Sequence, residues 1–191
     1  VHKLSVLVDN SFSEASALHV ENDYQSYGGI SRGVVLEKLP KHYIRQMHFT
    51  PIYKDGGWYA RIKLVITSLT EDRWDGTVNV TLKNGETEAF LCSETCSMKE
   101  NEDELTIETD EIACKAVSAW APEHPTLYML SAQLEDEDGK VIDDLTDRVG
   151  FREVRTQGKD ILLNGKKLQI KGFCRHEDHP QFGCALPLSA I

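Results

Sequence analysis

The sequence has few of the features that mark a disulfide-stapled, nucleic-acid-binding or membrane-spanning chain. Only five of its 191 residues are cysteine, an odd number without CxxC spacing, so reduced structural thiols are expected rather than disulfides or a zinc site. The net charge of -10 argues against nucleic acid or an anionic membrane surface as a partner. No apolar run is long enough to cross a bilayer. Reduced thiols predict a reducing, cytoplasmic compartment.

What the chain does contain is a series of short alternations of apolar and polar residues. They begin near Tyr43, and their inward-facing members are Ala60, Ile62, Leu64 and Ile66, then Val78, Val80 and Leu82, then Leu105 and Ile107, then Tyr128, Leu130, Ala132 and Leu134. Turn dipeptides follow two of these runs, at Asn84-Gly85 and Asp138-Gly139. About seven short strands in about 110 residues predict an all-β, immunoglobulin-like sandwich.

The residues before this region predict a few further strands. Leu4, Val6 and Val8 alternate with more polar neighbours, and the Gly28-Gly29 pair precedes a short apolar run at 34–36. We interpret residues 39–42 as a linker.

The end of the chain carries the most distinctive segment, residues 162–180 (LLNGKKLQIKGFCRHEDHP). Two apolar runs flank Asn164-Gly165, the dipeptide suited to a type I′ hairpin turn. The second run is predicted to be a strand over 170–174, and it leads into the charged residues 175–179 (RHEDH). A strand that ends in such a cluster is a common way for a sheet or barrel to present polar chemistry at its rim.

Three segments together resemble glycoside hydrolase family 2, the β-galactosidase and β-glucuronidase family. They are residues 23–32 (DYQSYGGISR), 120–128 (WAPEHPTLY) and 162–180, in the order that the family has them. The resemblance implies the end of a sugar-binding jelly roll over 1–40, an immunoglobulin-like sandwich over 41–153, and the start of a catalytic (β/α)8 barrel, with its first strand, over 154–191. We therefore interpret the sequence as a piece of a longer protein.

The same resemblance assigns two substrate-binding residues, Asp23 and His176. In the family, the His of the RHE motif and the Asp of the residue 23–32 segment contact the sugar. The alternatives are a salt-bridged polar rim for 175–179 and a turn or cap for Asp23. His176 and His179 have no third ligand in view, so no metal site is predicted, and no cofactor is expected.

Two other kinds of residue are candidates for a functional role. The acidic runs 100–104 and 135–138 lack the regular oxygen spacing of a calcium loop, so solvated hairpin ends are expected. Trp58, Trp74 and Trp120 suit either a sugar-stacking platform or packing within and between domains.

The resemblance implies a retaining exo-β-glycosidase that hydrolyses terminal β-linked sugars. No catalytic residue is expected within this chain, because the two glutamates of the family lie on later barrel strands; Glu177 is not one of them. The chain alone should therefore be inactive. We favour a β-galactosidase, with a β-glucuronidase or a non-catalytic carbohydrate-binding sandwich as alternatives. The expected partner is a carbohydrate substrate, and homo-oligomer formation stays open.

Overall fold

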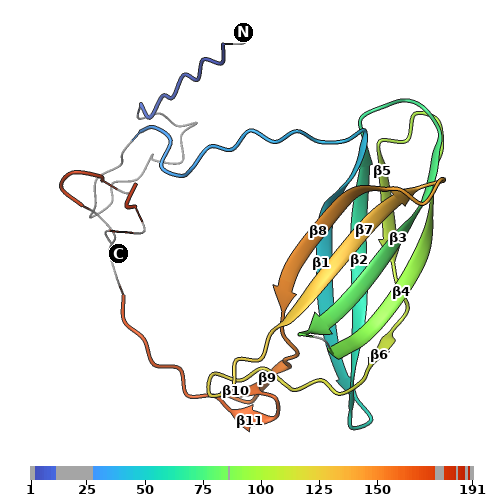
Figure 1. Ribbon diagram of the computed structural model, residues 1–191. Helices are drawn as coiled ribbons and strands as arrows, with labels where there is room; N and C mark the ends of the chain where they lie inside the picture. Colours follow the sequence, from blue (N-terminus) through green and yellow to red (C-terminus); the bar gives the residue numbers. More distant parts are fainter. Residues whose placement is uncertain are drawn as a thin grey trace. The chain divides into compact units, whose positions relative to one another are not determined.

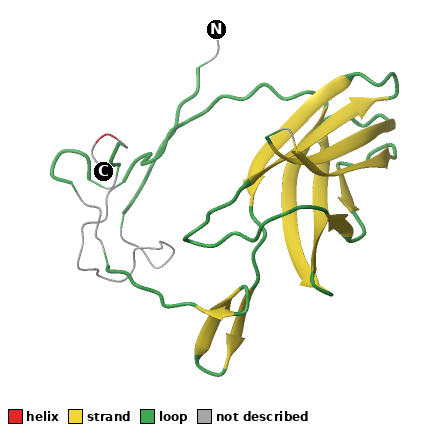
Figure 2. Cartoon of the chain, turned by 60° about the horizontal axis from the view of Figure 1, so that its bottom comes forward, coloured by secondary structure: helices red, strands yellow, loops and turns green. Residues whose placement is uncertain are grey.

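The protein is built almost entirely of strands and loops (Figures 1 and 2). A computed structural model describes residues 3–11, 28–85, 87–174, 179–183, 185–187 and 189. Its strands are β1 (His42–Lys54), β2 (Gly57–Ser68), β3 (Trp74–Asn84), β4 (Thr87–Met98), β5 (Glu104–Glu108), β6 (Ile112–Cys114), β7 (Tyr128–Asp136), β8 (Val141–Val149), β9 (Val154–Gln157), β10 (Asp160–Leu163) and β11 (Lys166–Lys167).

The first eight strands form two antiparallel sheets. One sheet has the order β1-β2-β5, with β6 also paired to β2, and the other has the order β4-β3-β7-β8. The last three strands form a separate small sheet of order β11-β10-β9. The predicted immunoglobulin-like sandwich is confirmed.

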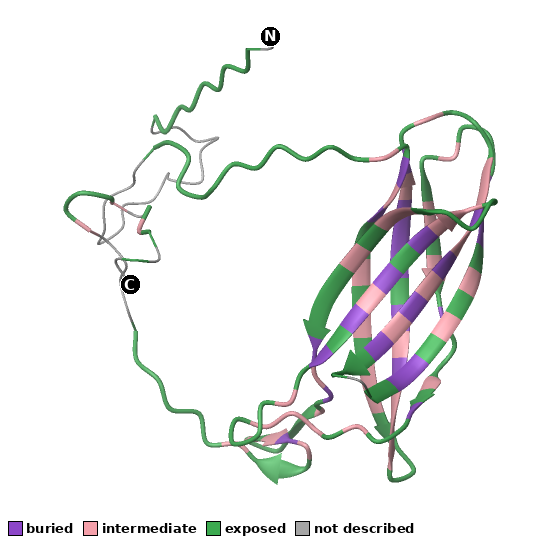
Figure 3. Ribbon diagram, viewed as in Figure 1, coloured by how far each residue is buried: buried purple, intermediate pink, exposed green. Residues whose placement is uncertain are grey.

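The core lies between the two large sheets and follows the alternation of the sequence. Figure 3 shows buried and exposed residues alternating along the strands of the sandwich. The predicted inward-facing residues of β2, β3 and β7 are at most 4% exposed. On the neighbouring strands β3 and β7 they lie side by side in register, as Val80 and Ala132 do. Side chains of a strand alternate between its two faces, so the inner face is apolar and the outer face polar.

Tight turns join the strands where the sequence has a turn dipeptide. At Asn164-Gly165, which connects β10 to β11, the φ angles are 49° and 76°, as a type I′ turn requires. The turn between β1 and β2, at Asp55-Gly56, has φ angles of 51° and 76° and was not predicted. Both turns need left-handed backbone, which Asn, Asp and Gly accept most readily.

A side chain closes one edge of the sandwich. The amide of Ile44 in β1 donates a hydrogen bond of 2.7 Å to Oδ2 of Asp143 in β8. The register of β1 shifts between Ile44 and Gln46 at this point. Asp143 therefore joins the edge strands of the two sheets, which share no backbone ladder.

The chain divides into two compact units, Lys38–Ile170 and Val1–Glu37 with Lys171–Ile191. The strands predicted at 4–8, 34–36 and 170–174 do not form: these residues belong to no ladder in the described part of the chain. A strand needs a neighbour for its backbone groups, and alternation alone cannot say whether one lies within reach. No helix in the ranges described has the length and hydrophobicity needed to cross a membrane.

Candidate functional site

Both residues expected to bind substrate, Asp23 and His176, lie outside the described residues, so their roles stay predictions. The end of the predicted charged cluster is described. His179 opens a short turn in which its carbonyl oxygen accepts hydrogen bonds from the amides of Phe182 and Gly183, at 3.2 and 2.8 Å. Its Nδ1 accepts a hydrogen bond of 3.2 Å from the amide of Gln181. This ring nitrogen therefore stabilises the turn.

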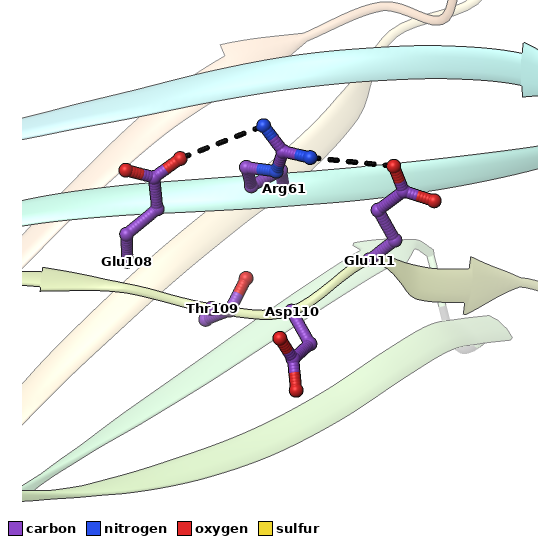
Figure 4. Close-up of a pocket in the computed structure, with 5 residues that line it drawn as sticks. All are labelled: Arg61, Glu108, Thr109, Asp110 and Glu111. Carbon is purple, nitrogen blue, oxygen red and sulfur yellow. Dashed lines mark hydrogen bonds and ion pairs between the residues drawn. The ribbon is translucent and has the colours of Figure 1, made fainter.

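A charged hollow of about 560 Å³ lies on the outer face of the first sheet, between the end of β5 and the start of β6 (Figure 4). Arg61 of β2 reaches Glu108 at 3.7 Å and Glu111 at 3.3 Å. Lys54 contacts Glu111 as well, and its hydrogen bond lowers the pKa of that carboxyl group. These charges are paired with one another at the solvent surface, where ion pairs contribute little to stability. The hollow is a salt-bridge network rather than an acid–base pair.

Aromatic side chains fill the end of the sandwich where β1 meets β2. Phe151 is fully buried there. Its ring meets those of Phe49, Trp58 and Tyr128 edge-on, with centroids 5.2, 5.5 and 5.4 Å away. Aromatic pairs favour this arrangement because the positive ring edge faces the negative ring face. The aromatic cluster of Phe49, Trp58, Tyr128 and Phe151 therefore fills this end of the core.

A pocket of about 270 Å³ lies beside this cluster, where the hairpin of β10 and β11 approaches the sandwich. It is lined by Tyr53, Trp58, Ala119, Glu153, Asn164 and Gly165. Aromatic rings beside a carboxylate and an amide are groups that can bind a sugar. Here, however, Asn164 uses its side chain within the fold: Oδ1 accepts from the amide of Glu153 and Nδ2 donates to the carbonyl oxygen of Trp120, both at 2.9 Å. The pocket thus marks a junction held by hydrogen bonds.

The three tryptophans do not share one platform. Trp58 belongs to the aromatic cluster, Trp74 stacks on His42 with ring centroids 4.7 Å apart, and the guanidinium of Arg152 lies 5.5 Å from the ring of Trp120. Packing, the second of the two sequence interpretations, describes Trp58 and Trp74, which both pack against the hydrophobic core.

The prediction of hairpin ends is confirmed for residues 135–138, between the paired strands β7 and β8, but is wrong for residues 100–104, which join β4 to β5 in the other sheet. Oδ1 of Asp136 accepts hydrogen bonds from the amides of Asp138 and Lys140, at 3.1 and 2.9 Å. Glu102 accepts one of 2.8 Å from the amide of Lys99. In the part of the chain that the structure describes, no three His, Cys, Asp or Glu side chains converge as metal ligands would.

The sequence did not reveal the surroundings of two residues, His42 and Asn164. His42, interpreted only as the end of a linker, is 7% exposed, and its Nε2 has no hydrogen-bond partner among the described residues. Burial, and to a lesser extent the charge of Lys41, lowers the pKa of His42. Asn164 was recognised as a turn residue, but the pattern gave no sign of its side-chain contacts.

Comparison with known proteins identifies the family. The model of glycosyl hydrolases family 2 matches residues 42–152, more than half of the chain. The chain belongs to this family.

Three family 2 relatives illustrate its range of sequences. A crystal structure of a β-galacturonidase from Eisenbergiella tayi, bound to galacturonate, has 53% identity and a TM-score of 0.85; the match covers 96% of this chain and 32% of that one. A β-galactosidase from Kluyveromyces lactis is 29% identical over 98% of this chain and 20% of its own length. A putative β-glucuronidase from Formosa agariphila is 30% identical over 95% of this chain and 21% of its own length. The chain thus spans about a fifth of these two curated relatives.

Proposed function

We propose that this chain is part of a retaining exo-β-glycosidase that removes a terminal β-linked uronic acid, with β-galacturonides as its preferred substrates. The observation that supports this choice is the 53% identity to the Eisenbergiella tayi β-galacturonidase, against 29% and 30% for the β-galactosidase and the putative β-glucuronidase. This proposal replaces our preference for a β-galactosidase from the sequence motifs alone.

The proposed reaction needs residues that this chain does not supply. Retaining glycosidases use two carboxyl groups about 5–5.5 Å apart, one as nucleophile and one as acid and base. We place both in the remainder of the protein, so the chain by itself should hydrolyse nothing. Activity of the isolated chain that survives repurification would contradict this.

Within the chain, Asp23 and His176 are our candidates for sugar recognition. A carboxylate accepts hydrogen bonds from neighbouring hydroxyls, and an imidazole N–H donates one. In a buried site, a hydrogen bond to a charged group contributes about 1.5–3 kcal/mol, or roughly a 10- to 150-fold change in rate.

The first experiment is a substrate panel on the full-length protein. Nitrophenyl β-galacturonide, β-galactoside and β-glucuronide are compared by kcat/KM, for wild type, His176→Ala and the control His48→Ala, whose side chain is exposed on β1. We expect β-galacturonide to exceed β-galactoside by at least about a hundredfold. His176→Ala should lose roughly 10- to 150-fold, and His48→Ala should match wild type.

Each alternative has its own outcome in this panel, and a preference for β-glucuronide would support a β-glucuronidase. A preference for β-galactoside would support the second candidate, a β-galactosidase, which the match to the Kluyveromyces lactis enzyme over 98% of this chain favours. A folded protein that turns over no substrate but binds the sugars would support a non-catalytic carbohydrate-binding sandwich.

A further inference from the structure

We propose that Asn164 is a positioning residue that fixes the hairpin of β10 and β11 to the end of the sandwich. Three hydrogen bonds converge on it. Its amide donates to the carbonyl oxygen of Glu153 at 2.8 Å, its Oδ1 accepts from the amide of Glu153, and its Nδ2 donates to the carbonyl oxygen of Trp120. One turn residue therefore holds two separate loops of the sandwich end.

The hydrogen bonds continue from Asn164 into the core. The amide of Trp120 donates a bond of 2.7 Å to the carbonyl oxygen of Phe151, which is fully buried. Gly150 suits this close approach, because a Cβ at that position would lie 3.2 Å from Cβ of Trp120, a tight contact. The hairpin is thus two hydrogen bonds away from Phe151, the fully buried centre of the aromatic cluster.

The turn itself does not require asparagine. Asp55 opens a turn of the same geometry, with φ angles of 51° and 76° against 49° and 76° at Asn164-Gly165. Aspartate has no side-chain donor, and glycine has neither donor nor acceptor. Among residues that readily adopt positive φ, only asparagine both accepts from Glu153 and donates to Trp120. The side-chain amide of Asn164 is therefore needed for these two hydrogen bonds and not for the turn.

The consequence for function rests on the function proposed above. After β11 the chain leads within a few residues to 175–179, which carries His176. Only residues 168–174 separate the hairpin from that segment in the sequence, which is the reason to expect that a loss at Asn164 reaches it. A loosened hairpin should weaken substrate binding more than it slows the chemical step, because the catalytic carboxylates lie elsewhere.

The first test measures the hairpin directly and needs no activity. Amide hydrogen exchange is compared for wild type, Asn164→Gly, Asn164→Asp and the matched control Asp55→Gly, which makes the other hairpin turn equally flexible. In Asn164→Gly, peptides from 153–168 should exchange about tenfold faster, as expected for a lost hydrogen bond in a locally opening segment. Peptides from β2, β3 and β7 should be unchanged.

The variants separate the side-chain contacts from the turn. Asn164→Asp keeps the acceptor and loses the donor, so its exchange should fall between wild type and Asn164→Gly. Asp55→Gly should leave peptides from 153–168 as in wild type. Exchange in Asn164→Gly equal to wild type, or an equal effect of Asp55→Gly, would overturn the role given to Asn164.

The second test uses the full-length enzyme. Asn164→Gly should raise KM about tenfold with kcat within about twofold, Asn164→Asp should lie between, and Asp55→Gly should match wild type. Faster exchange with an unchanged KM would overturn the link to the substrate site. A wild-type protein without activity would contradict the proposed function instead. The exchange experiment would still decide the role of Asn164.

Discussion

Removing the ring of Phe151 should destabilise the sandwich strongly. The residue is fully buried, and three aromatic rings pack around it edge-on. A buried Phe→Ala substitution costs about 3–5 kcal/mol, from lost burial and the cavity left behind. The edge-on contacts add about 0.5–1.5 kcal/mol each beyond the area that they bury, so we expect the upper half of that range. Domains are stable by roughly 5–15 kcal/mol, so the loss is about a quarter of the total or more.

Urea unfolding followed by far-ultraviolet circular dichroism measures this loss without depending on Trp58, whose fluorescence would change with its neighbour. The matched control is Phe173→Ala, because that ring is 89% exposed; it should change stability by less than about 0.5 kcal/mol. The loss of stability in Phe151→Leu should fall between those of Phe151→Ala and the control. This variant remains measurable if Phe151→Ala does not fold. A cost of Phe151→Ala below about 1.5 kcal/mol, or no larger than that of the control, would refute the reasoning.

Two further predictions concern single contacts of the sandwich. Asp143→Ala leaves the amide of Ile44 without its acceptor and should cost about 1–3 kcal/mol in urea unfolding; a similar cost for its exposed neighbour Asp144→Ala would refute this. Because burial lowers the pKa of His42, the unfolded chain binds more protons than the folded one below the ordinary histidine pKa, so stability should fall between about pH 7 and pH 5. His42→Phe should flatten this dependence, whereas His48→Phe should not; equal slopes in both variants would contradict it.

The sequence by itself determined β2, β3, β5 and β7 and several turns, though not the turn at Asp55-Gly56. The alternation along β2, for example, gave its inward residues correctly, from Ala60 to Ile66. These features are local: side chains alternate with a period of two residues, and a dipeptide such as Asn164-Gly165 adopts its turn through its own backbone preferences. The order of three short motifs also indicated the family, which the family model and relatives confirm.

The tertiary structure decided what each residue meets. Nothing in the alternation shows that His42 is buried against Trp74, or that Asp143 accepts the amide of Ile44 from the opposite sheet. The same limit explains why the strand predicted at 170–174 is wrong. The sequence shows its apolar residues, but not whether a neighbouring strand lies within reach. Asn164 shows the difference within one residue. Its turn follows from its own φ preference, whereas its role depends on Glu153 and Trp120, which only folding brings within hydrogen-bonding distance.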